Sequence, residues 1–143
     1  MTVEENLKKL NIELPDATPP VGSYVATKIV DNLLYISGQI SIDKNGNLIK
    51  GKLGSELNTE KGYMAAERCA LNILSQAKKA CEGNLDKIKT CIKLTGFVNS
   101  TSDFVEQPKV INGASDTIAK ILGEKGMHTR AAVSANSLPL GVA

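Results

Sequence analysis

Apolar residues at three- and four-residue spacing predict two amphipathic helices. The first is expected to begin at Asn58 or Thr59, either of which can cap it, and to end near Cys81. The second is expected to begin near Gln107, with Pro108 in its first turn. The apolar faces consist of Tyr63, Ala66, Ala70, Ile73, Leu74 and Ala77 in the first helix, and of Val110, Ala114, Ile118, Ile121 and Leu122 in the second.

Four runs of β-forming residues predict strands. Residues 23–30 and 33–40 flank Asp31-Asn32, a dipeptide that favours a tight hairpin turn. Residues 88–99 and 128–136 are expected to form two further strands. In each strand, apolar residues alternate with small or polar ones, so one side is expected to face the helices. The expected helix-facing residues are Leu34, Ile36, Ile40, Ile92, Leu94, Val98, Ala131, Val133 and Ala135.

The order of these elements predicts an α+β fold, a mixed β-sheet with both long helices packed on one face. A short helix is expected over residues 3–11, followed by a loop over residues 14–22 that is rich in helix breakers. The sheet face away from the helices has two interpretations. It is either exposed to water, as is common in antiparallel sheets, or packed against copies of itself in a barrel. Composition alone slightly favours the first.

The 143 residues fit one domain, with residues 1–20 as an N-terminal extension. Seventeen basic and fifteen acidic residues give a net charge of +2, without a basic block, and only five residues are aromatic. Nucleic acid is therefore an unlikely partner. The sequence has no apolar run of the roughly 20 residues that a membrane span needs. The acidic start MTVEENLKKL does not resemble a signal peptide, so a cytoplasmic location without membrane contact is expected.

Three cysteines and one histidine do not have the spacing of a metal site. Cys69, Cys81 and Cys91 are interpreted as reduced thiols, because cysteine is commonly buried for packing reasons alone. No metal site is therefore expected from these residues.

Arg130 stands at the head of the last predicted strand, among small residues. A guanidinium is permanently charged and carries five N–H donors, so placing it there is costly unless an anion meets it. The anion is either a carboxylate of the protein, in a structural ion pair, or a bound ligand.

Several motifs, in this order, resemble the Rid family of small proteins, also called YjgF/YER057c/UK114 and often labelled endoribonuclease L-PSP. They are GSY at 22–24, LLYISGQI at 33–40, KLTGFVNSTSDF at 93–104, Asn112, and R-x-x-V…LPLG at 130–141. The KVINGAS and LPLGV motifs resemble a less characterised branch of the family.

This resemblance implies a chorismate-mutase-like fold in a homotrimer, with the sheets forming a central barrel and small-carboxylate pockets between subunits. Deaminases of the family hydrolyse enamines and imines such as 2-aminoacrylate to 2-keto acids and ammonia. The family's arginine corresponds to Arg130, which would bind the substrate carboxylate through two hydrogen bonds. Tyr24, from the adjacent subunit, and Asn112 correspond to other pocket residues. The expected substrate-binding residues are Ser37, Gly38, Gln39, the backbone of Ala131 and Ala132, and His128. The resemblance implies neither a metal nor an organic cofactor.

The sequence differs from the deaminases in three ways. Ala132 replaces a cysteine that many of them carry, and the chain stops at Ala143, before a strand that in the family holds a glutamate near the attacking water. A general acid or base contributes about 10² to 10⁴ in rate, so a chain without one can bind substrate yet react slowly. The third difference is His128, which either transfers a proton in the pocket or lies exposed at a loop edge. Two other functions therefore remain open: a non-catalytic trimer that binds a small carboxylate or a protein partner, and, less favoured, an endoribonuclease.

Overall fold

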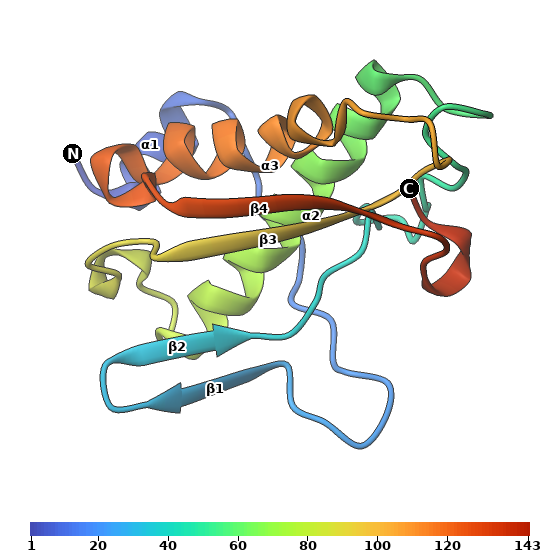
Figure 1. The fold of residues 1–143 in the computed structure, drawn as a ribbon. Helices are drawn as coiled ribbons and strands as arrows, with labels where there is room; N and C mark the ends of the chain where they lie inside the picture. The colour runs from blue at the N-terminus through green and yellow to red at the C-terminus, as the bar shows by residue number, and fades with distance from the viewer.

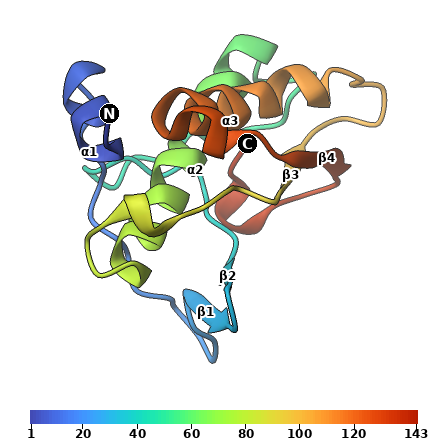
Figure 2. The same ribbon diagram turned by 90° about the vertical axis from the view of Figure 1, so that its left-hand side faces the viewer.

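The strands and helices form two layers in the computed structural model, which describes residues 1–143 (Figures 1 and 2). The strands are β1 (Thr27–Val30), β2 (Leu33–Ile36), β3 (Lys93–Asn99) and β4 (Thr129–Ala135), and the helices are α1 (Val3–Lys9), α2 (Thr59–Ala80) and α3 (Gln107–Leu122). Short 3-10 helices cover Leu85–Lys87, Gly123–Gly126 and Pro139–Gly141. The turned view places all three helices on the same side of the strands. The expected α+β fold is confirmed.

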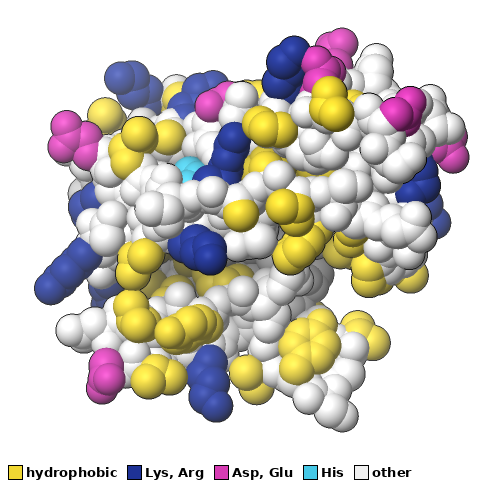
Figure 3. All heavy atoms as spheres, in the orientation of Figure 1, with side chains coloured by type: hydrophobic (Ala, Val, Ile, Leu, Met, Phe, Trp, Pro, Cys, Tyr) yellow, Lys and Arg dark blue, Asp and Glu magenta, His cyan; other side chains and the backbone are white.

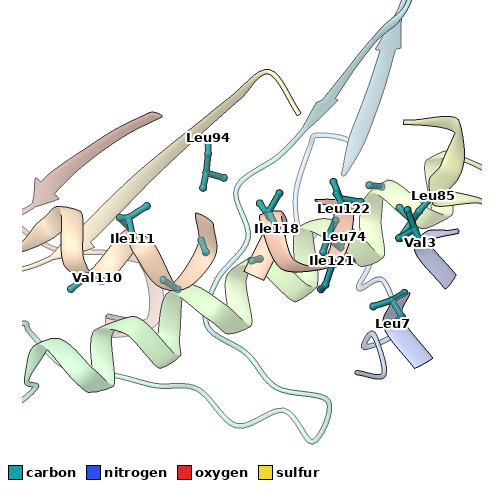
Figure 4. Packing of buried hydrophobic residues seen from close by; sticks show 14 of the residues in the cluster. Val3, Leu7, Leu74, Leu85, Leu94, Val110, Ile111, Ile118, Ile121 and Leu122 are labelled. Atoms are coloured by element: carbon teal, nitrogen blue, oxygen red, sulfur yellow. The ribbon is translucent and has the colours of Figure 1, made fainter. Parts of the chain in front are cut away.

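Helices α2 and α3 pack along each other and form the centre of the core (Figure 4). The predicted cap is present, since the Asn58 side chain accepts a hydrogen bond from the backbone N–H of Lys61. The five residues predicted for the apolar face of α3 are all buried. Helix α1 adds Val3 and Leu7 to the same core. None of the helices combines the length and the apolar character that crossing a bilayer requires.

Two glycines allow the backbones of α2 and α3 to approach closely. A Cβ atom at Gly113 would lie 2.1 Å from the backbone oxygen of Tyr63, and one at Gly62 would lie 2.8 Å from the side chain of Val110. Neither position has space for a methyl group. Gly113 therefore marks the contact between the two helices.

The strands form two separate pairs, where a single mixed sheet was predicted. β1 pairs with β2 in antiparallel orientation, and β3 pairs with β4 in parallel orientation. The predicted strand 33–40 ends at Ile36. The chain beyond it is attached to α2, because Asn72 Nδ2 donates hydrogen bonds to the carbonyl oxygens of Ile40 at 3.1 Å and Ile42 at 2.9 Å.

The side of β4 that faces the helices differs from the prediction. Arg130 pairs with Leu94 on β3, and Leu94 is buried beneath α3, so Arg130 and Ala132 face the helix layer. Thr129, Ala131 and Val133 lie on the open side. The assignment of Ala131, Val133 and Ala135 to the helix side is therefore wrong. β4 has small residues on both sides, so its alternation does not determine its orientation. The register with β3 does.

Candidate functional site

The guanidinium of Arg130 lies against the N-terminal half of α3. Its Nη1 atom donates hydrogen bonds to Asn112 Oδ1 at 2.7 Å and to Ser115 Oγ at 3.2 Å. Its Nη2 atom lies 3.4 Å from the carbonyl oxygen of Pro108. Three neutral acceptors on one helix therefore hold a half-buried cation.

No carboxylate pairs with Arg130. The five ion pairs of the structure all involve other residues, including the second arginine, Arg68, which lies 4.0 Å from Asp43. Within one protomer, Arg130 therefore forms no structural ion pair. The N–H of Nε and one N–H of Nη2 make no hydrogen bond with the protein. These two nitrogens share one edge of the guanidinium plane, which is the arrangement that binds a carboxylate through two hydrogen bonds.

His128 joins the same cluster through Ser115. The ring atom Nε2 lies 2.9 Å from Ser115 Oγ, and Nδ1 lies 2.6 Å from the carbonyl oxygen of Gly126. Both ring nitrogens are therefore engaged within the protein. The ring is half-buried rather than free at a loop edge.

Helix α3 supplies most of this cluster because of its repeat. Pro108, Asn112 and Ser115 follow one another at spacings of four and three residues, so they lie on one face of the helix, towards β4. Asn112 was predicted from the sequence, whereas Ser115 was not. The three-residue spacing from Asn112 is the signal that identifies it.

The other predicted site residues lie elsewhere in the protomer. Tyr24 is more than half exposed and precedes β1 by three residues. Strand β1 is at the foot of the molecule in Figure 1, whereas α3 is at its top. Ser37 Oγ donates to the carbonyl oxygen of Val25 at 2.7 Å, and Gln39 Nε2 donates to that of Ser37 at 3.0 Å. A Cβ atom at Gly38 would meet nothing within 4 Å. None of these four residues makes a hydrogen bond to the Arg130 cluster.

The two alanines after Arg130 face opposite ways. Ala132 packs against the hydrophobic core, and Ala131 is exposed on the open side of β4. Because Ala131 and Ala132 lie in the β3–β4 ladder, their backbone groups are positioned by the neighbouring strand.

The three cysteines are free thiols in separate places. Burial raises the pKa of the Cys69 thiol to about 12, and burial also raises the pKa of the Cys91 thiol. Raising a thiol pKa reduces the fraction of nucleophilic thiolate near neutral pH. Nowhere do three or more His, Cys, Asp or Glu side chains gather closely enough to hold a metal ion.

The comparisons with known proteins agree with this architecture. Residues 4–142 match the family model described as "YjgF/chorismate_mutase-like, putative endoribonuclease". The chain is 42% identical to Protein TCP17 of Trypanosoma cruzi over 142 residues, which cover 99% of this chain and 88% of that protein.

Two solved structures are similar over nearly the whole chain. Protein Atu1372 of Agrobacterium tumefaciens, whose function is described as unknown, is 46% identical with a TM-score of 0.89, covering 99% of this chain and 87% of that one. A "putative endoribonuclease" of Shewanella oneidensis MR-1 is 35% identical with a TM-score of 0.94, covering 99% and 93%. The chain therefore belongs to the YjgF/chorismate-mutase-like family, the Rid family that its motifs resemble.

Proposed function

We propose that the protein binds a small 2-imino acid, such as 2-aminoacrylate, through Arg130 and hydrolyses it to a 2-keto acid and ammonia. One observation carries the proposal: a half-buried guanidinium is held by neutral acceptors, forms no ion pair with its own chain, and leaves the N–H of Nε and one N–H of Nη2 without a partner. An anionic ligand would compensate the cost of placing that charge there.

In the proposed reaction, Arg130 holds the substrate carboxylate and Asn112 fixes the guanidinium that binds it. Water adds to the imine carbon to give a carbinolamine, and loss of ammonia from this intermediate leaves the 2-keto acid. The backbone of Ala131 and Ala132 is proposed to help hold the water. Water addition removes a proton from the water, and ammonia loss requires a proton on the nitrogen. Each of these transfers needs a proton acceptor or donor beside the reacting atom.

We also propose that the working site lies between copies of the chain in a homotrimer. Tyr24, Ser37, Gly38 and Gln39 do not reach Arg130 in one protomer, so another copy must supply them if they act on the same ligand. The open side of the strands, which faces the viewer in Figure 3, carries apolar side chains that a second copy would cover. They are Val30, Leu33, Tyr35, Phe97 and Val133, each at least 41% exposed.

Replacing Phe97 by glutamate is expected to dissociate this trimer, because the change places an unpaired charge in an apolar interface. Sedimentation equilibrium should give three times the 15.2 kDa chain mass for the wild type and the mass of one chain for Phe97→Glu. Met64→Glu is the matched control, since Met64 is an exposed apolar residue on α2. A wild type that sediments as a monomer would refute the trimer.

A coupled assay tests the reaction. Threonine dehydratase releases 2-iminobutanoate, and the protein is expected to speed the appearance of 2-ketobutyrate beyond the uncatalysed rate by about 10² or more. The rate is followed with semicarbazide present to trap free imine. No acceleration at any protein concentration would exclude the deaminase.

A second function, carboxylate binding without reaction, is favoured by one observation. No Asp or Glu side chain forms a hydrogen bond or ion pair with Arg130, Asn112 or Ser115, and both nitrogens of His128 are already engaged. Heat of binding with 2-ketobutyrate, together with no acceleration in the coupled assay, would support this function. The same engagement of the single histidine argues against the third candidate, an endoribonuclease.

A further inference from the structure

The hydrogen bonds behind Arg130 have one consistent direction. The carbonyl oxygen of Gly126 can only accept, so Nδ1 of His128 must carry the proton. In the neutral ring Nε2 is then an acceptor, and the hydroxyl of Ser115 must donate to it. The lone pairs of Ser115 Oγ are thereby left for the N–H of Arg130 Nη1, at 3.2 Å.

Gly126, which accepts the last of these hydrogen bonds, packs against α3, the helix that carries Asn112 and Ser115. Gly126 is buried, and a Cβ atom there would lie 2.6 Å from the backbone oxygen of Ile118 on α3. Its carbonyl therefore has little freedom to move relative to Asn112 and Ser115 on the same helix. The ring of His128 is consequently held at a set distance from Arg130.

We propose that Ser115 and His128 are positioning residues, which orient Arg130 so that its Nε–Nη2 edge stays free for a ligand carboxylate. The proposal rests on the proposed carboxylate binding by Arg130. Asn112 alone provides one acceptor to Nη1, and the guanidinium can still rotate about that contact. A second acceptor on the same nitrogen restricts this freedom, because Nη1 is then held by two residues of α3.

This role predicts a particular kinetic signature. The carboxylate of a 2-imino acid keeps its charge throughout the reaction, so Arg130 binds the ground state and the transition state alike. Loss of a uniform binding interaction raises KM and leaves kcat unchanged. Misplacing a group that acts on the reacting nitrogen would instead lower kcat.

The test uses Ser115→Ala, with Ser115→Thr as the variant that retains the hydroxyl. The dissociation constant for 2-ketobutyrate, measured by calorimetry, is expected to rise about tenfold in Ser115→Ala, as one hydrogen bond to a charged group predicts. It is expected to recover in Ser115→Thr. Ser134→Ala is the control, because Ser134 lies on the same strand as Arg130 but its hydroxyl bonds to Ser100, at 2.6 Å, and not to the Arg130 cluster.

His128→Asn tests whether the two residues act as a unit. It is expected to weaken binding as much as Ser115→Ala, and the double variant is expected to lose no more than either single variant. Additive losses, or an unchanged constant in Ser115→Ala while Arg130→Ala loses binding, would overturn the positioning role and leave the proposed function intact.

NMR decides the proposal even if the wild type does not bind 2-ketobutyrate. The chain has one histidine, so its long-range ¹H–¹⁵N signals need no assignment. The neutral ring is expected to be protonated on Nδ1, and the Nη groups of Arg130 to rotate slowly in the wild type and quickly in Ser115→Ala. Protonation on Nε2, or equal rotation in both proteins, would refute the inference. Absence of binding with these NMR results intact would refute the proposed function alone.

Discussion

Arg130→Ala is expected to weaken binding of 2-ketobutyrate by about 100-fold or more and to leave the chain folded. Two hydrogen bonds to a charged carboxylate are lost together, and each contributes roughly 1.5–3 kcal/mol. The fold should survive because Arg130 is only half-buried and its partners, Asn112 and Ser115, remain hydratable at the surface of α3. Calorimetry gives the affinity, and far-ultraviolet circular dichroism with a thermal scan gives the folded state.

Two further variants make the result specific. Arg68→Ala removes the chain's other arginine, which is likewise half-buried but faces Asp43, and should leave binding unchanged. Arg130→Lys keeps the charge without the planar fork, so an intermediate loss is expected. Equal affinity in Arg130→Ala and the wild type would show that the carboxylate binds elsewhere.

The sequence predicted those parts of the fold in which periodicity and burial agree. In α3, the residues between Val110 and Leu122 that were expected to face the core are buried, because a helix with one apolar stripe has one favourable orientation. Leu94 and Val98 in β3 follow the same logic at a period of two. β4 does not, because alanine and serine occupy both of its sides and the cost of exposing either is small.

The sequence indicated several residues of the candidate site, but only partly which of them lie together in the structure. Asn112 and Arg130 were expected together, and the structure joins them at 2.7 Å. The link from Ser115 to His128 depends on how the end of α3 returns to β4, which no local pattern encodes. Tyr24 and residues 37–39 stay apart from Arg130 in a single protomer, so their place in the site remains a prediction about the assembly.

Arg130 depends on α3, and α3 depends on Gly113. This residue follows Asn112 directly, about 100° further around the helix, and faces α2. A Cβ atom there would lie 2.1 Å from the backbone oxygen of Tyr63. The contacts on the two sides of α3 are thus coupled through one turn of helix. The approach of α2 on one side fixes the position of Asn112, which binds Arg130 on the other.

Gly113→Ala is therefore expected to destabilise the protein by about 3 kcal/mol, at the upper end of overpacking costs, because backbone cannot move aside as a side chain can. The gain in helix propensity from glycine to alanine, about 1 kcal/mol, offsets only part of this cost. A thermal scan should show the midpoint lowered by about 10 °C. Gly38→Ala is the control for stability, since its Cβ would meet nothing within 4 Å and its midpoint should not change. If the unfolding midpoint of Gly113→Ala equals that of the wild type, α2 and α3 have room to separate. In that case α3 is not the fixed support that the Arg130 cluster requires.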